Sequence, residues 1–342
     1  MSNLSKLRLA AAGLLVAAGF MAAPAVIAQD LPSVALVLHG NLGDKSFFDS
    51  AAAGVNQAAA DLGVEIKIIE AGSDPSKWEP ALLDAADAGF DIVIAGTFQM
   101  IDFVVKAAPQ YPDQKFITFD TTPDFSACEC PNVLGVMYQT SSAGYLAGYA
   151  AAKLSTSGIL GTIIGADFPT VTDFKVGFDQ GAKAANPDVQ ILNADAGGVF
   201  NDPAKGKEMA LAQLGQGADV IFPIAGATGI GALQAVKDAG KLAVGVDSDQ
   251  AAIFAPTDPA QADVIFTSVE KKVGQSLFLA IKGTVDGTQE YGKFVLLGLA
   301  DGAVGISKNE WYEKLVPAEI RAEVDALEAK IASGEIVVDT VM

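Results

Sequence analysis

The feature that most constrains the fold is a regular alternation of short apolar runs with longer stretches of helical periodicity. The apolar run Val34–Leu38 is followed by a glycine turn, and then by apolar residues at helical spacing over 46–62. This unit recurs along the chain, with predicted helices of about 10 to 15 residues. Strands that alternate with such helices predict parallel sheets covered by helices on both faces.

The predicted elements fall into two series that divide near residue 140. We expect strands at 34–38, 64–68, 92–95, 116–119, 133–138, 159–165, 190–194, 220–224, 242–246, 264–268 and 294–299. We expect helices at 46–62, 75–88, 100–108, 141–154, 171–185, 203–214, 230–239, 273–283 and 317–331. The chain is longer than one hydrophobic core usually serves, so the sequence predicts an α/β fold with two doubly wound, Rossmann-like lobes.

The late elements form no lobe of their own, so we expect the chain to cross between the lobes more than once. We assign residues 29–139 and 264–288 to an N-terminal lobe, and residues 140–263 and 289–342 to a C-terminal lobe. The ligand cleft is then expected between the two lobes.

The first 28 residues have the pattern of a cleavable signal peptide. Lys6 and Arg8 precede the uncharged run Leu9–Met21, and small residues at Val26 and Ala28 predict cleavage after Ala28. An uncleaved membrane anchor is the alternative, because the segment is just long enough to span a bilayer. A proline ahead of the cleavage pattern favours the signal peptide, so we expect a protein exported to the periplasm.

The charge balance excludes one class of partner. The chain has 22 Lys and Arg against 41 Asp and Glu, a net charge of −19. Such an acidic surface repels phosphate backbones and anionic lipid, so nucleic-acid binding is not expected.

Histidine and cysteine are too few for most metal sites and nucleophilic enzymes. His39 is the only histidine, and Cys128 and Cys130 are the only cysteines. The cysteines can form a local disulfide, although a bridge across one residue is strained, or they can remain inert thiols. We therefore expect no metal, no cofactor and no catalytic activity.

Candidate ligand contacts lie in the loops that follow the predicted strands, because ligands of open parallel sheets bind beyond the carboxyl ends of the strands. These loops carry acids and aromatic rings but few bases. The candidates are Asp44, Ser46, Phe47, Thr97, Phe98, Asp120, Phe200, Gly226, Asp247 and Lys271. This mixture suits a neutral ligand with a ring and several hydroxyl or amide groups.

Several blocks within these loops carry a resemblance to a known family. Gly-Asp-Lys-Ser-Phe at 43–47, Phe-Asn-Asp-Pro-Ala-Lys-Gly-Lys-Glu at 200–208 and Gly-Val-Asp-Ser-Asp-Gln at 245–250 resemble the basic membrane protein (BMP) family, the PnrA-like receptors of ABC importers. The similarity covers nearly the whole chain after the predicted cleavage site. It implies a type I periplasmic binding protein with three hinge crossovers, a monomer that binds a nucleoside, most often a purine nucleoside, and delivers it to an ABC permease in the inner membrane.

The resemblance also implies individual roles. Phe47 and Phe200 match the two rings that clamp the base, and Asp120 matches the acid that faces it. Asp247 and Lys271 match the pair that holds the ribose hydroxyls, and Gly226 would bring backbone close to the sugar.

This sequence departs from the family pattern at several polar positions. Leu38 stands where the family usually has an acid, Gly43 where it has Asp or Asn, and Phe48 where it has Asn. Residues 140–142 lack the usual acids. These departures alter several polar positions that face the ligand in the family.

The candidates have ordinary structural alternatives. Phe47 and Phe200 can be core residues at helix starts, and Asp44 and Ser46 lie where helix capping is the usual role. Lys271 adjoins a second lysine and can belong to a solvated face.

Other functions remain open from the residues alone. The spacing Gly-x-x-Gly-x-Gly at 226–231 with an acid at Asp247 is a weak dinucleotide pattern, but it is not the usual fingerprint, and export argues against such an enzyme. The same class of receptor can instead bind a purine base, a flavin or a sugar-like polyol. A sensory receptor that signals to a membrane kinase is a further alternative.

Overall fold

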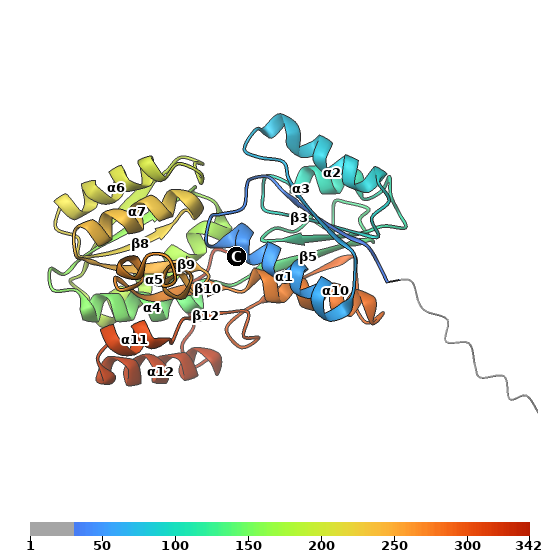
Figure 1. Cartoon of the computed structure of the whole chain (residues 1–342). Helices are drawn as coiled ribbons and strands as arrows, with labels where there is room; N and C mark the ends of the chain where they lie inside the picture. Colours follow the sequence, from blue (N-terminus) through green and yellow to red (C-terminus); the bar gives the residue numbers. More distant parts are fainter. Residues whose placement is uncertain (1–30) are drawn as a thin grey trace, which may run out of the picture. The chain divides into compact units, whose positions relative to one another are not determined.

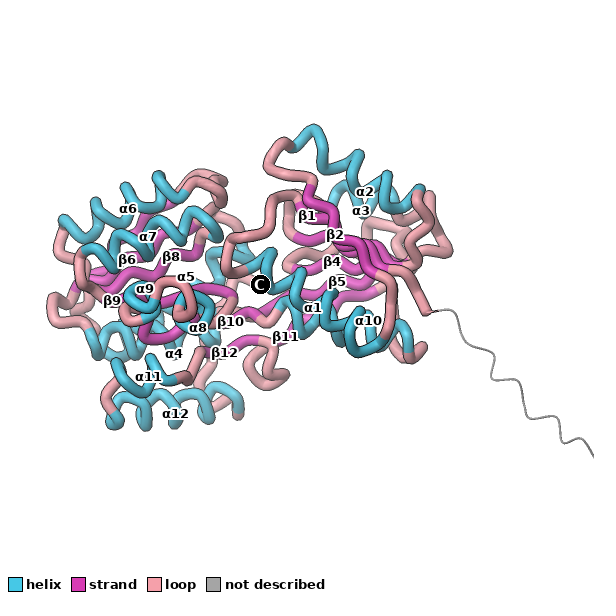
Figure 2. Tube along the Cα trace, viewed as in Figure 1, coloured by secondary structure: helices cyan, strands magenta, loops and turns pink. Residues whose placement is uncertain are grey.

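The computed structural model describes residues 31–342, and the predicted signal peptide at 1–28 lies outside the described residues. Residues 31–342 contain two six-stranded sheets (Figures 1 and 2). The first sheet has the order β11-β5-β4-β3-β1-β2, and the second has the order β12-β10-β9-β8-β6-β7. We call the elements built on these sheets the first lobe and the second lobe.

The strands of the first sheet are β1 (Val34–Leu38), β2 (Ile66–Glu70), β3 (Ile92–Gly96), β4 (Lys115–Phe119), β5 (Val133–Tyr138) and β11 (Lys293–Leu297). Those of the second sheet are β6 (Ile159–Ile164), β7 (Gln190–Asp195), β8 (Val220–Ile224), β9 (Leu242–Asp247), β10 (Ile265–Lys271) and β12 (Val304–Ile306). Only the β10–β12 pair is antiparallel among the ladders of the described chain. This confirms the predicted α/β fold with two doubly wound lobes.

The helices of the first lobe are α1 (Phe47–Leu62), the short 3-10 helix η1 (Pro75–Lys77), α2 (Trp78–Asp87), α3 (Ile101–Ala107) and α10 (Val273–Val285). Those of the second lobe are α4 (Ser141–Leu154), α5 (Pro169–Ala185), α6 (Pro203–Gly215), α7 (Gly226–Asp238), α8 (Gln250–Phe254), α9 (Pro259–Ala262), α11 (Glu310–Leu315) and α12 (Ala318–Ala332). Within residues 31–342, none of these helices combines the length and apolarity that a bilayer crossing requires.

The chain passes between the two sheets three times, after β5, after β10 and after β11. Two assignments made from the sequence are therefore wrong. Residues 265–271 pair with β9 in the second sheet, not in the N-terminal lobe, and residues 293–297 pair with β5 in the first sheet, not in the C-terminal lobe. Strand pairing between distant segments leaves no mark in local periodicity, so the sequence pattern could not distinguish these arrangements.

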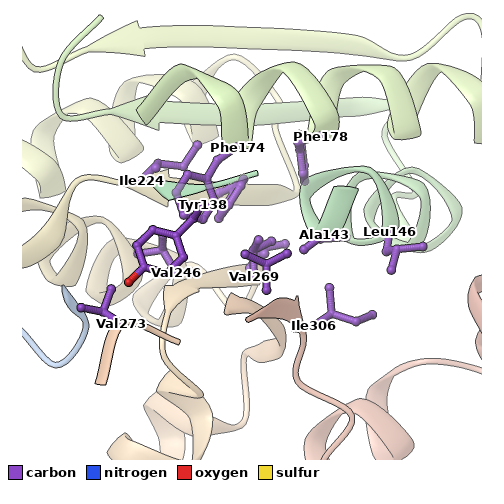
Figure 3. Packing of buried hydrophobic residues seen from close by; sticks show 14 of the residues in the cluster. Tyr138, Ala143, Leu146, Phe174, Phe178, Ile224, Val246, Val269, Val273 and Ile306 are labelled. Atoms are coloured by element: carbon purple, nitrogen blue, oxygen red, sulfur yellow. The ribbon is translucent and has the colours of Figure 1, made fainter. Parts of the chain in front are cut away.

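Alternation along β1 shows how each sheet is covered on both faces. Leu36 packs in one cluster with Val55 of α1 and Leu277 of α10, whereas Val37 packs in another with Leu82 of α2. The larger cluster continues from the first lobe into the second. Figure 3 shows part of it, with Tyr138 and Val273 of the first lobe and Val246 and Val269 of the second. A strand covered on both faces must be apolar throughout, which is why β1, β3 and β8 are fully buried runs.

Helices α4 and α5 cross at unusually close range because glycines face the partner backbone. A Cβ at Gly177 would collide with the carbonyl oxygen of Ser141, and one at Gly148 would collide with that of Phe178. This packing explains the small-residue composition of the sequence at 141–154.

We predict that Gly177→Ala lowers the free energy of unfolding by about 1–3 kcal/mol, because the helix backbones must move apart. Urea denaturation measures this change. Gly215→Ala is the matched control, since Gly215 ends α6 with open space where a Cβ would stand, and it should be neutral or slightly stabilising. Equal stability of the two variants would contradict the close-packing account.

Candidate functional site

A cavity of about 430 Å³ lies where the carboxyl ends of strands from both sheets meet. Its walls come from the loops after β1, β2, β3, β4, β7 and β8, from the last residues of β8, β9 and β10, and from the first turns of α1, α2, α5 and α7. All of the predicted site residues except Ser46 line it. The loops that the sequence singled out therefore converge on one cavity.

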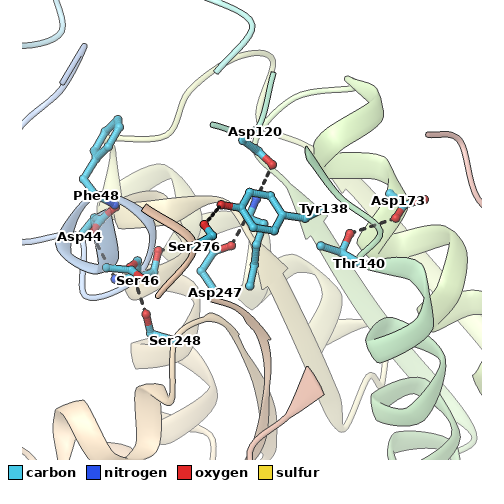
Figure 4. A network of polar contacts seen from close by, with 12 residues as sticks. Asp44, Ser46, Phe48, Asp120, Tyr138, Thr140, Asp173, Asp247, Ser248 and Ser276 are labelled. Carbon is cyan, nitrogen blue, oxygen red and sulfur yellow. Dashed lines mark hydrogen bonds and ion pairs between the residues drawn. The ribbon is translucent and has the colours of Figure 1, made fainter. Parts of the chain in front are cut away.

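The charged centre of the cavity is Lys271, at the end of β10. Its Nζ lies 3.0 Å from Oδ1 of Asp120 and 3.5 Å from Oδ1 of Asp247, and its side chain is 4% exposed. Figure 4 shows Asp120 and Asp247 as members of one network of polar contacts. Lys271 is therefore not part of a solvated face, which was its structural alternative.

Three aromatic rings surround the Lys271 ammonium. The Nζ atom lies 4.7 Å from the ring centroid of Phe47, 5.0 Å from that of Phe174 and 5.9 Å from that of Tyr138. Burial opposes the charge of Lys271, but Asp120 and Asp247 outweigh it and raise the pKa of the amine. The ammonium is charged and is held by two carboxylates inside an aromatic box.

Strained backbone concentrates at this cavity. Thr97, Asp120 and Asp247 follow or end β3, β4 and β9, and their φ angles are +75°, +57° and +63°. Apart from Lys45, no other non-glycine residue within 31–342 has a positive φ. Non-glycine residues rarely adopt a positive φ angle. Such backbone strain is concentrated at functional sites, where it can orient a side chain.

One carboxylate oxygen of Asp247 lacks a hydrogen-bond donor. Its Oδ2 accepts a hydrogen bond from the Ser46 hydroxyl at 3.3 Å, whereas its Oδ1 has no hydrogen-bond donor within the described chain and only the ion pair with Lys271. Burial raises the pKa of Asp247 to about 6; Lys271 opposes this shift, and the charges of Asp120 and Asp44 add to it.

Ser46 does not line the cavity, which corrects its prediction as a ligand contact. The residue is fully buried behind Asp247, and its hydroxyl donates to that carboxylate. Its carbonyl oxygen also accepts a hydrogen bond from the Ser248 hydroxyl at 3.1 Å. Ser46 therefore positions Asp247 and joins the two lobes.

Asp44 lines the cavity but acts as a helix cap. Its carboxylate accepts hydrogen bonds from the backbone N–H groups of Ser46, Phe48 and Asp49 at 3.1, 2.8 and 3.1 Å. Burial raises the pKa of Asp44, and these hydrogen bonds oppose the shift. The capping alternative thus describes most of what this carboxylate does.

The two predicted clamp rings enter the cavity from different lobes. Phe47 begins α1, and its ring lies 5.4 Å from that of Phe119. Phe200 lies in the loop before α6, and its ring occupies the space where a side chain at position 165 would stand, so Gly165 is required there. Each lobe therefore contributes one ring of the predicted clamp.

A further ring pair joins the lobes at the cavity. Phe98 lines the cavity from the first lobe and stacks on Phe168 of the second lobe, with ring centroids 3.9 Å apart and planes at 26°. Phe98 therefore also serves the contact between lobes.

Sequence reasoning did not select four cavity rings, those of His39, Phe48, Trp78 and Phe174. Phe48 adjoins Phe47, and His39 directly follows the first predicted strand at the glycine turn, so their positions were an available signal. Phe174 lies inside α5, where helical periodicity marks it as core and gives no sign of the cavity. Burial lowers the pKa of His39 to about 4, so the imidazole is neutral near neutral pH.

Comparison with known proteins decides the family. Residues 31–340 match the family described as ABC transporter substrate-binding protein PnrA-like. The chain belongs to this family. It is 33% identical to basic membrane protein A of Borreliella burgdorferi over 316 residues, which cover 91% of this chain and 89% of that protein.

Solved structures of other substrate-binding proteins share the PnrA-like fold. An ABC transporter solute-binding protein from Aeropyrum pernix K1 has a TM-score of 0.79 and 28% identity, covering 90% of this chain and 94% of that one. One from Conexibacter woesei DSM 14684 has a TM-score of 0.72 and 26% identity, covering 90% and 99%. The chain is thus an ABC transporter substrate-binding protein with the two-lobed fold of that class.

In this PnrA-like protein, His39 and Asp247 make the stability depend on pH in opposite senses. His39 has a folded-state pKa of about 4 against 6.5 in the unfolded chain. Its contribution to the free energy of unfolding is therefore present above pH 6.5 and is lost as the pH falls to 4. Asp247 has a folded-state pKa of about 6 against 3.8 in the unfolded chain. Its contribution to the free energy of unfolding is therefore present below pH 3.8 and is lost as the pH rises to 6.

We predict that His39→Gln removes the loss of stability that protonation of His39 causes in acid. Acidification from pH 7 to 4.5 should then lower the free energy of unfolding of the variant by about 2 kcal/mol less than that of the wild type. Urea denaturation at a series of pH values measures the difference. Asp247→Asn is the paired variant and should change the pH profile in the opposite direction. An acid profile of His39→Gln identical to the wild type would contradict the buried neutral imidazole.

Proposed function

We propose that this protein is an exported solute receptor that closes its two lobes on a neutral, planar ligand of the nucleoside class and delivers it to an ABC permease in the inner membrane. The observation that carries the proposal is the Lys271 ammonium, buried between Asp120 and Asp247 in a cavity that Phe47 and Phe200 line.

The charges of the cavity favour an uncharged ligand. Asp44, Asp120 and Asp247 face a single lysine, so a phosphate or carboxylate on the ligand would meet excess negative charge. Hydroxyl or ring N–H groups instead supply the donor that Asp247 Oδ1 lacks, and Lys271 can donate in return. Vicinal ribose hydroxyls satisfy both requirements.

The aromatic walls favour a planar ligand. A flat heterocycle between Phe47 and Phe200 would gain about 1–3 kcal/mol from each stacking contact. Because the rings come from different lobes, only the closed state provides both contacts. Ligand binding would therefore favour lobe closure, which is the signal a permease can recognise.

The side chains that could drive chemistry support binding, not catalysis. Burial lowers the pKa of His39 to about 4, which makes its imidazole a weak base, and Lys271 is kept charged by its carboxylates. A charged lysine is a hydrogen-bond donor and not a nucleophile. Export follows from the predicted signal peptide at 1–28, and we propose that the receptor acts as a monomer.

We predict that Phe47→Ala and Phe200→Ala each weaken nucleoside binding by about 1–3 kcal/mol, because each variant loses one stacking partner. Isothermal titration calorimetry measures the change. Phe294→Ala is the matched control, since Phe294 lies on the edge strand β11, is 52% exposed and does not line the cavity. Wild-type affinity in both cavity variants would remove the clamp assignment.

A thermal-shift panel tests the ligand class. Adenosine, guanosine, inosine, adenine, riboflavin, ribose and adenosine monophosphate are compared, since a tight ligand raises the melting temperature by mass action. We predict stabilisation by at least one nucleoside and none by the monophosphate. Stabilisation by ribose alone would indicate a polyol receptor, stabilisation by riboflavin a flavin receptor, and stabilisation by the monophosphate would contradict the electrostatic argument.

A further inference from the structure

The aromatic wall of the cavity continues beyond the clamp. From Phe47 the ring contacts run to Phe48 at 5.5 Å, from Phe48 to His39 at 5.1 Å and from His39 to Trp78 at 5.3 Å between centroids. All four residues line the cavity. We call the His39, Phe48 and Trp78 side chains the outer ring cluster.

The outer ring cluster has no part in the ion cluster or the clamp. Its rings come from the end of β1, the start of α1 and the start of α2, yet they meet in one part of the cavity. Each of the three side chains is only partly buried, although the strand core next to them is fully buried. Apolar rings that converge on a cavity and remain partly exposed offer surface that a ligand can cover.

The polar atoms of the cluster indicate what kind of group fits there. The Trp78 indole N–H donates to the carbonyl oxygen of Gly72 at 2.7 Å, so the polar edge of this ring is already satisfied. His39 Nε2 lies 3.3 Å from the Thr97 hydroxyl, and its ring is uncharged. The cluster therefore offers ring faces and no charge to an incoming group.

We propose that the outer ring cluster is a second subsite, which takes a neutral, planar apolar substituent attached to the clamped heterocycle. The inference rests on the proposed function, because the clamp and the ion cluster orient the rest of the ligand. A ligand of this class has a hydroxyl-rich end at Lys271, a flat heterocycle between Phe47 and Phe200, and an aromatic group against Trp78.

The chain offers a direct spectroscopic test. It has two tryptophans, Trp78 in the subsite and Trp311 on α11, which does not line the cavity. In the Trp311→Phe variant the fluorescence reports on Trp78 alone. The probes are adenosine and benzyladenosine, in which the exocyclic amine of adenosine carries a benzyl group.

We predict that benzyladenosine binds at least about tenfold more tightly than adenosine, because the benzyl group removes ring surface from water. It should change the Trp78 emission more strongly than adenosine does. The Trp78→Ala change, made in the protein that retains Trp311 and measured by calorimetry, should bring the affinity for benzyladenosine down to that for adenosine. Phe200→Ala should weaken both probes alike.

The outcomes separate this inference from the proposed function. Equal affinity of the two probes, or a preference that survives Trp78→Ala, would overturn the second subsite and leave the nucleoside receptor standing. Binding of other nucleosides of the thermal-shift panel, but of neither probe, would overturn the subsite in the same way. Failure of every nucleoside to bind would overturn both. Measurable adenosine binding by the Trp78→Ala variant shows that the variant is folded.

Discussion

The ion cluster of Lys271, Asp120 and Asp247 is the interaction on which the rest of the site depends. Its members come from both sheets, so the same contacts hold the lobes together and define the polar end of the cavity. Burying three charges costs free energy that their mutual attraction only partly recovers. The incomplete hydrogen bonding of Asp247 is what a ligand with donor groups can remedy. Positive φ angles at both aspartates aim the carboxylates at the lysine, at the expense of local backbone strain.

The site and the lobe interface are built from the same short loop. Residues 44–47 cap α1, supply the Phe47 ring and contact the second lobe through backbone oxygens. Gln250 donates its amide to the carbonyl oxygen of Lys45 at 3.2 Å, and the Ser248 hydroxyl donates to that of Ser46. The Phe98–Phe168 stack adds an apolar contact between the lobes. A change in lobe position would therefore alter the cavity wall directly, with no need for a separate signal.

Features that depend on local sequence patterns could be predicted, whereas the assignment of strands to sheets, which depends on pairing between distant segments, could not. Strand and helix periodicities placed most elements but missed the short α8, α9, α11 and β12. The rule for strand ends found Asp120 and Asp247. Helix α7 begins at Gly226, before the predicted start at Ile230, and β10 extends to Lys271. The sheet to which 265–271 and 293–297 belong could not be predicted, because pairing partners lie far away in the sequence. The direction of Ser46, and the convergence of Trp78 with His39, depend on packing between elements and also left no local signal.

The most direct test of the account is a crystal structure of the protein with the nucleoside that binds it best. We predict a heterocycle between the rings of Phe47 and Phe200, with a ligand hydroxyl within hydrogen-bond distance of Asp247 Oδ1 and the Lys271–Asp120 pair intact between the lobes. A ligand bound outside this cavity, or Lys271 paired with an anionic group of the ligand in place of Asp120, would contradict the account.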